Sequence, residues 1–167
     1  MSDTGELAAR VQALEDLEAV KQCMYRYWRC LDYKRFDELP DVFTEDVSAD
    51  YGMPGWGAEG RDALVDFLHA NESRDDYKVS HAGHNPEVEL NGPTTAHGLF
   101  KLHDWVVVGG RTLMRGYGQY DVDFTKADDR WRIRRLRLHY AFREEHHAFV
   151  DNVQAGLTPA LTDGGPR

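Results

Sequence analysis

The stretch that decides the fold is residues 94–125, which read TTAHGLFKLHDWVVV, then GG, then RTLMRGYGQYDVDFT. Two long runs rich in valine, tyrosine, phenylalanine and tryptophan flank Gly109-Gly110. Two consecutive glycines supply the positive φ angles that a two-residue hairpin turn requires. The stretch therefore predicts two antiparallel strands, at 94–108 and 111–125.

Further strands are predicted on both sides of this hairpin. The runs Val79–Leu90 and Arg130–Phe142 have the same composition, and turn signals at 91–93 and 126–129 separate them from it. Hairpin connections between consecutive strands make an antiparallel meander. A short strand at Val47–Tyr51 is expected to pair with one edge of this sheet.

The last predicted strand breaks its own alternation. One parity holds Trp131 and Ile133, and the other holds Leu136, Leu138, Tyr140 and Phe142. One extra residue near Arg134 and Arg135, a β-bulge, would bring both apolar sets to the same buried face. Bulges bend sheets, so we expect a strongly curved sheet around a cavity. The same bulge places Arg135 and Arg137 on the outer face.

Helices are predicted before the strands. Apolar residues at intervals of three and four predict one long amphipathic helix, with the stripe Leu14, Leu17, Val20, Met24, Tyr27 and Leu31. A short helix is expected at 36–43, a third helix at Arg61–Ala70, and a loop at Gly52–Gly57. Residues 1–6 are expected to be frayed. Helices followed by a sheet indicate an α+β domain.

The chain is expected to form one domain at residues 1–153, with a disordered tail at 154–167. The formal net charge of -9 argues against binding to nucleic acid, and alternation divides the arginines of 130–137 between two faces. No apolar run approaches the roughly 20 residues that span a membrane. Cys23 and Cys30 lie about 10.5 Å apart along a helix, too far for a disulfide, which favours free thiols in a cytoplasmic protein.

A few polar residues are candidates for chemistry. Asp32 stands where the long helix ends, and His81 and His84 open the strand at 79–90. Two histidines three residues apart suggest a metal site, but no histidine or cysteine cluster of matching spacing completes one, so no metal is expected. His103 lies within a strand, and Tyr51 could be an ordinary core residue.

The order of these pieces resembles the NTF2-like superfamily, and within it the SnoaL-like and scytalone dehydratase-like proteins. The resemblance covers residues 14–142 and rests on Tyr27-x4-Asp32, Phe36-Asp37-Glu38-Leu39, Val42–Val47, His81-x3-Asn85-Pro86 and Asp129–Ile133. It implies a cone-shaped barrel in which a strongly curved antiparallel sheet is closed by N-terminal helices around an apolar pocket.

The resemblance also implies an enzyme that eliminates a leaving group without metal or cofactor. His81 falls at the position of the family's catalytic histidine, and Asp32 at that of the carboxylate of its dyad. Tyr27, Tyr51 and His103 match further catalytic or pocket residues. On an ideal helix Tyr27 and Asp32 point about 140° apart, so they converge only if the helix ends or bends near Leu31.

Two departures from scytalone dehydratase indicate another substrate. Leu31 stands where that enzyme has a tyrosine, and its late serine and asparagine are replaced within 118–123. The expected substrate is a small hydrophobic molecule similar to a hydroxy ketone. A C-terminal arginine used by some relatives corresponds to Arg135 or Arg137, although the bulge turns both away from the pocket.

Elimination of water beside a carbonyl needs a base near neutral pH, which imidazole supplies. A carboxylate at Asp32 would fix the tautomer of His81. A dehydratase-type lyase is the first reading. The same proton abstraction would also serve a SnoaL-like polyketide or steroid cyclase or isomerase, and a pocket that binds without catalysis is a third reading. The outer sheet face suggests a homodimer or homotrimer.

Overall fold

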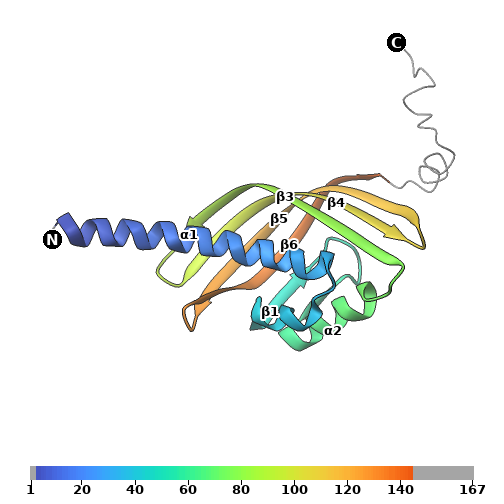
Figure 1. The fold of residues 1–167 in the computed structure, drawn as a ribbon, viewed down its shortest axis with the longest axis horizontal. Coiled ribbons are helices and arrows are strands. Elements are labelled where there is room, and N and C mark those ends of the chain that lie inside the picture. The colour runs from blue at the N-terminus through green and yellow to red at the C-terminus, as the bar shows by residue number, and fades with distance from the viewer. Residues whose placement is uncertain (1–2, 145–167) are drawn as a thin grey trace, which may run out of the picture.

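The computed structural model describes residues 3–144 (Figure 1). In chain order the elements are α1 (Asp3–Asp32), the 3-10 helix η1 (Phe36–Asp41), β1 (Phe43–Asp50), β2 (Gly57–Glu59), α2 (Arg61–Glu72), β3 (Tyr77–Leu90), β4 (Thr95–Val108), β5 (Arg111–Ala127) and β6 (Arg130–Glu144). This is the predicted α+β class, with helices first and the long strands afterwards. The expected tail at 154–167 lies outside the described residues.

The six strands form one curved sheet in the order β2-β1-β6-β5-β4-β3. The meander from β3 to β6 is antiparallel as predicted, but β1 runs parallel to β6, so the sheet is mixed. The sheet is not closed into a barrel, because β2 and β3 remain as edges. Helix α1 lies across one face of the sheet, and α2 lies beside β1 (Figure 1). The two helices together cover that face of the cone. We call the face that α1 covers the inner face.

The predicted bulge in β6 is confirmed at Arg134. Asp123 pairs with Arg135 while Phe124 pairs with Ile133, which leaves one extra residue on β6. Both apolar sets consequently reach the inner face, and Trp131, Ile133, Leu136 and Leu138 are all buried. The predicted curvature follows, because a bulge bends its strand and increases its twist.

A second bulge, which the sequence did not predict, lies at Ala141. Tyr117 pairs with Phe142 while Gly118 pairs with Tyr140, so one residue of β6 has no partner between them. The expectation that Phe142 is buried is therefore wrong, and 57% of it is exposed. The same shift returns Arg143 to the side of the inner cavity.

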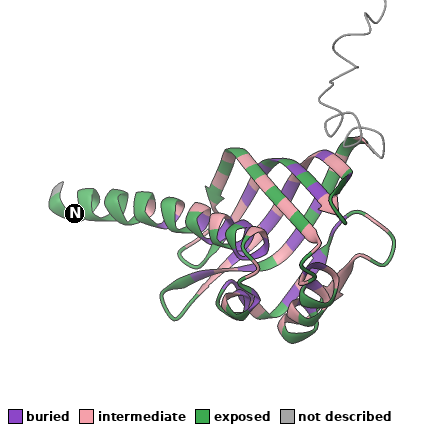
Figure 2. Ribbon diagram, turned by 45° about the vertical axis from the view of Figure 1, so that its right-hand side comes forward, coloured by how far each residue is buried: buried purple, intermediate pink, exposed green. Residues whose placement is uncertain are grey.

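Helix α1 is longer than expected. It begins at Asp3, so residues 3–6 are helical rather than frayed. Its N-terminal half extends past the sheet and has nothing beneath it (Figures 1 and 2). Leu14, predicted to belong to the buried stripe, is for this reason 66% exposed, and Leu7 and Val11 are also exposed.

The short elements differ from the prediction at their ends. The second helix ends at Asp41, and Phe43 opens β1, where its ring is fully buried and packs against Tyr27 at 5.8 Å between centroids. Gly57 lies in the short strand β2 rather than in a loop. Helix α2 continues to Glu72, two residues past the expected end. That extension places a carboxyl group in the interior.

Both cysteines, Cys23 and Cys30, are buried free thiols, as the sequence predicted. Burial raises the pKa of Cys23 to about 12, so this thiol is unreactive at neutral pH. Among the described residues, no helix is both long and apolar enough to cross a membrane.

Candidate active site

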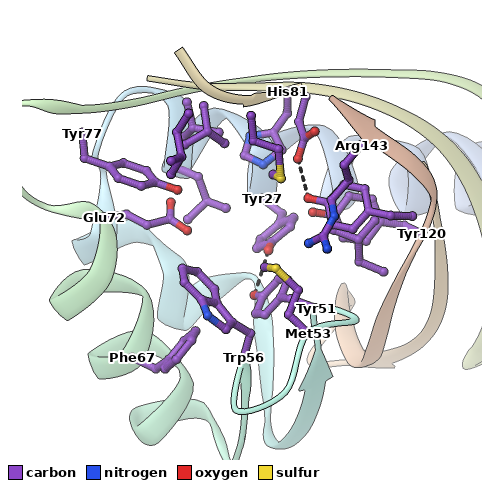
Figure 3. Close-up of a pocket in the computed structure, with 18 residues that line it drawn as sticks. Tyr27, Tyr51, Met53, Trp56, Phe67, Glu72, Tyr77, His81, Tyr120 and Arg143 are labelled. Carbon is purple, nitrogen blue, oxygen red and sulfur yellow. Dashed lines mark hydrogen bonds between the residues drawn. The ribbon is translucent and has the colours of Figure 1, made fainter. Parts of the chain in front are cut away.

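One cavity of about 260 Å³ opens between the inner face of the sheet, the end of α1 and helix α2 (Figure 3). Its walls are aromatic, with tyrosines at positions 27, 51, 77, 120 and 140 and with Trp56 and Phe67. Polar atoms are few, which is typical of small-molecule sites. Of the five candidate residues, three line this cavity directly: Tyr27, Tyr51 and His81.

His81 and Asp32 form a hydrogen-bonded pair at one wall. Nδ1 of His81 lies 2.7 Å from Oδ1 of Asp32, and the two side chains are 7% and 20% exposed. The backbone N–H of His81 also donates to both carboxylate oxygens, at 3.1 and 3.2 Å. That N–H is free to do so because β3 is an edge strand with a neighbour on one side only. The carboxylate therefore holds both the backbone and the ring of His81.

The end of α1 positions Asp32. Lys34 adopts a left-handed φ of 56°, and the N–H of Arg35 donates to the carbonyl of Cys30 at 2.7 Å, while that of Lys34 donates to Leu31 at 3.2 Å. These are the two bonds of a Schellman motif, which ends a helix at a defined residue. The helix thus ends at Asp32, on the side of β3, and Tyr27 faces the cavity one turn earlier. The two residues serve the site from different directions rather than converging.

The hydroxyl groups of Tyr27 and Tyr51 lie 2.8 Å apart inside the cavity. Both rings are buried, and burial raises the pKa of both phenols well above the usual value. Both therefore stay protonated at neutral pH. Since one hydroxyl of such a pair donates to the other, the accepting hydroxyl keeps its own hydrogen for a ligand.

Asp104 is a cavity residue that the sequence did not predict. It is 3% exposed, and its Oδ2 accepts a hydrogen bond of 2.6 Å from the hydroxyl of Tyr140. Its Oδ1 has no hydrogen-bond partner among the described residues. Gly116 on the neighbouring strand makes this arrangement possible, because a Cβ there would lie 2.0 Å from Oδ1 of Asp104.

Glu72 is a second buried carboxyl group in the cavity that the sequence did not predict. It is the last residue of α2, it is 8% exposed, and its Oε2 has no hydrogen-bond partner within the described part of the chain. Its pKa is raised to about 7, chiefly by burial and also by the neighbouring Asp32, while His81 and Lys34 act in the opposite direction. At neutral pH a large fraction of Glu72 is consequently a neutral acid.

His103 does not lie in the cavity. On β4 the inward residues are Leu102, Asp104 and Val106, so alternation turns His103 to the exposed outer face. There its ring stacks on Tyr117 at 4.3 Å between centroids. The expectation of a second pocket histidine is wrong for this geometric reason.

The two arginines proposed from the C-terminal strand also lie outside. Arg135 forms ion pairs with Asp121 at 3.1 Å and Asp123 at 2.7 Å on the outer face, and Arg137 is exposed. Their outward placement was predicted from the bulge. The arginine that reaches the cavity wall is Arg143.

The outer face also carries the described group that comes closest to a metal site, formed by His97, Asp121 and Asp123. Its carboxylates already pair with Arg135, and Asp123 also holds Nδ1 of His97 at 2.9 Å. A cation would have to compete with that guanidinium. His84, the other half of the HxxH pattern, is exposed on the face opposite His81.

The chain matches a known protein family. Residues 12–137 match the SnoaL-like domain. The protein belongs to the SnoaL-like family. An uncharacterized protein of Mycobacterium tuberculosis is 29% identical to this SnoaL-like chain over 124 residues, which cover 74% of the chain and 84% of the relative. The resemblance inferred from the sequence is thereby confirmed.

Solved structures share the fold of this SnoaL-like protein. A proposed scytalone dehydratase of Novosphingobium aromaticivorans aligns with a TM-score of 0.75 and 25% identity, over 83% of this chain and 93% of that one. A hexachlorocyclohexane dehydrochlorinase of Novosphingobium barchaimii aligns with a TM-score of 0.67 and 16% identity, over 88% and 96%. The second likeness shows the fold alone.

Proposed function

We propose that the protein is a cofactor-independent lyase that removes water from a small hydrophobic β-hydroxy ketone by acid–base catalysis. The observation that carries this proposal is the 2.7 Å bond between Nδ1 of His81 and Asp32 at the wall of an aromatic cavity. A solvated surface pair would serve no chemistry, but this histidine side chain is 7% exposed and lines the cavity. The name of the structural neighbour at 25% identity, a proposed scytalone dehydratase, supports an elimination.

The base in this proposal is Nε2 of His81. A carboxylate can only accept hydrogen bonds, so the ring nitrogen that faces Asp32 carries the hydrogen and Nε2 keeps its lone pair. Nε2 then takes the proton from the carbon next to the ketone. Asp32 stabilises the imidazolium that forms, in the way that the aspartate of a protease triad supports its histidine.

Tyr27 and Tyr51 are proposed to bind the ketone oxygen. Negative charge develops on this oxygen when the α-proton leaves, and a hydrogen-bond donor directed at it lowers the barrier. Because their phenols stay protonated, the pair keeps one hydrogen available for this purpose. The aromatic walls exclude water and favour an apolar, compact substrate.

A panel of β-hydroxy ketones tests the reaction class. Incubation with the wild-type protein, followed by mass spectrometry, is expected to show products lighter by one water. A product of unchanged mass would indicate the isomerase or cyclase reading instead. Binding without any product across the panel would favour a protein that only binds ligands, and would contradict the lyase.

We also propose that the protein is a cytoplasmic homodimer or homotrimer. The free thiols of Cys23 and Cys30 favour a reducing compartment. On the projecting half of α1, the exposed apolar side chains are Leu7, Val11 and Leu14. Their spacing of four and three residues is that of a coiled-coil seam, which a second copy of the same helix would cover.

A further inference from the structure

We propose that Glu72 is the proton donor of this site, which protonates the departing hydroxyl group while His81 takes the α-proton. This inference rests on the proposed lyase function and deepens it. Hydroxide is a poor leaving group, so the elimination needs an acid as well as a base. The family resemblance indicated His103 as a catalytic or pocket residue, but that ring lies on the outer face. Tyr27 and Tyr51 are directed to the ketone, so the acid must come from elsewhere in the cavity.

The position of Glu72 fits this role. It continues the inward stripe of α2, four residues after Leu68 and eight after Leu64, and so it enters the cavity from the helix side. His81 enters the same cavity from β3. In Figure 3 the carboxyl group of Glu72 points into the cavity, with the hydroxyl of Tyr77 directed toward it. A substrate lying between α2 and β3 would have the acid on one side and the base on the other.

The carboxyl group is free to act on a ligand. Its Oε2 is buried and finds no hydrogen-bond partner among residues 3–144. Lys34 is the nearby cation, but its ammonium group donates to the backbone carbonyls of Ser73, at 3.1 Å, and Arg74. Leaving a buried polar oxygen unpaired is costly, and a bound hydroxyl group would remove that cost.

The surroundings of Glu72 favour its neutral form. The titratable groups that act on it or feel its charge are Tyr27, Asp32, Lys34, Tyr51, Tyr77, His81 and Tyr120. Burial is the largest influence and raises the pKa of Glu72 to about 7. Carboxyl groups held neutral in apolar sites act as acids in other enzymes. His81, whose Nδ1 is bonded to Asp32, lines the same cavity, so an acid and a base face one substrate.

The step balances without any further reagent. Nε2 of His81 takes the α-proton, and the electrons of that C–H bond form the carbon–carbon double bond. The carbon–oxygen bond breaks, and the oxygen leaves as water with the proton of Glu72. The site is left with an imidazolium and a carboxylate. Loss of one proton from His81 to solvent and gain of one by Glu72 restore it.

Reactions of two related compounds separate the role of Glu72 as the acid from that of His81 as the base. The aldol adduct of benzaldehyde and acetone loses water to give benzalacetone, which is followed by absorbance. Benzylacetone has no leaving group, and exchange of its α-protons for deuterium, followed by NMR, reports the base alone. Glu72→Gln is nearly isosteric and removes only the acid. Glu89→Gln, at an exposed position of β3, is the matched control.

Glu72→Gln is expected to slow water loss by about a hundredfold or more, while α-proton exchange stays within about threefold of wild type. The fall in rate at high pH, which reports deprotonation of the acid, is expected to disappear. Glu89→Gln should change neither reaction. Water loss by Glu72→Gln within threefold of wild type would overturn the inference, as would an equal loss of both reactions. If the wild-type protein exchanges but never dehydrates, Glu72 is not a donor; if it does neither, the lyase proposal fails too.

Discussion

At the scale of single residues, the carboxylate of Asp32 does two things at once, because it accepts from both the backbone N–H and the ring Nδ1 of His81. The backbone contacts fix where the carboxylate lies, and the ring contact fixes which nitrogen carries the hydrogen. Substitution by asparagine changes the second property with little change of shape, so it isolates the tautomer.

Asp32→Asn is expected to disturb the tautomer of His81 while the fold is retained. An amide can present its NH₂ group to Nδ1, which would move the ring hydrogen to Nε2 and occupy the lone pair that the base requires. Nitrogen NMR of the labelled ring should show hydrogen on Nδ1 in wild type and a shift toward Nε2 in the variant. An unchanged ring tautomer together with full activity would contradict this role.

Glu72 carries a testable cost in stability. Its pKa is about 7 in the folded protein against a usual 4.5, so between these values the folded chain holds a proton that the unfolded chain has released. The contribution of Glu72 to the free energy of unfolding of wild type should therefore fall as the pH rises from about 4.5 to about 7, by roughly 3 kcal/mol. Because glutamine cannot ionise, the Glu72→Gln variant should not show this fall in the free energy of unfolding.

Urea denaturation of Glu72→Gln and wild type at about pH 4 and about pH 8 measures this difference. The variant is expected to be the more stable of the two at the higher pH, with the gap closing at the lower pH. Glu89→Gln should follow wild type at both. A gap between Glu72→Gln and wild type that does not change with pH would show that burial does not hold this carboxyl neutral.

At the scale of elements, the strands were predicted better than the residues between them. Two parities of apolar residues on β6 required a bulge, and it was found at Arg134. The bulge at Ala141 was not predicted because the predicted strand has only one residue, Phe142, after it. Alternation within β4 could also have predicted the position of His103. Because Leu102 and Val106 face inward, Asp104 between them faces inward too, and His103 faces outward.

Glu72 escaped prediction for a different reason. The third helix was expected to end at Ala70, so Glu72 belonged to no element and its relation to Leu64 and Leu68 was not considered. The bond between His81 and Asp32 joins residues 49 positions apart, and that between Tyr27 and Tyr51 residues 24 apart. No local periodicity encodes such contacts. The family resemblance indicated the pair of His81 and Asp32, and the contact between Tyr27 and Tyr51 was not predicted.

The projecting half of α1 gives a prediction of its own. Replacement of Leu7, Val11 and Leu14 by serine should lower the mass in solution measured by light scattering, because the apolar seam between copies is lost. The domain itself should remain folded, since these side chains are largely exposed and lie on the half of α1 that projects past the sheet. Serines at Glu6 and Ala9, which lie off the stripe, are the control. A wild-type monomer, or a triple variant with unchanged mass, would contradict the proposed assembly.

At the scale of the whole molecule, the fold brings three distant parts of the chain to one cavity. The end of α1 supplies Asp32, α2 supplies Glu72, and the edge strand β3 supplies His81. Curvature of the sheet creates the space, and the open edge at β3 leaves the backbone N–H that Asp32 occupies. The order of the predicted elements indicated an α+β domain, but the meeting of these elements depends on how the sheet bends.

The central claim is that His81 acts as a base in this cavity, and the most direct measurement compares kcat/KM for water loss from the aldol adduct in His81→Ala and His84→Ala. The two histidines lie on the same strand, one lining the cavity and the other exposed on the opposite face. We predict that His81→Ala loses activity by about a hundredfold or more, within the range for removal of a general base, and that His84→Ala stays within about threefold of wild type. Equal activity of both variants would contradict the account.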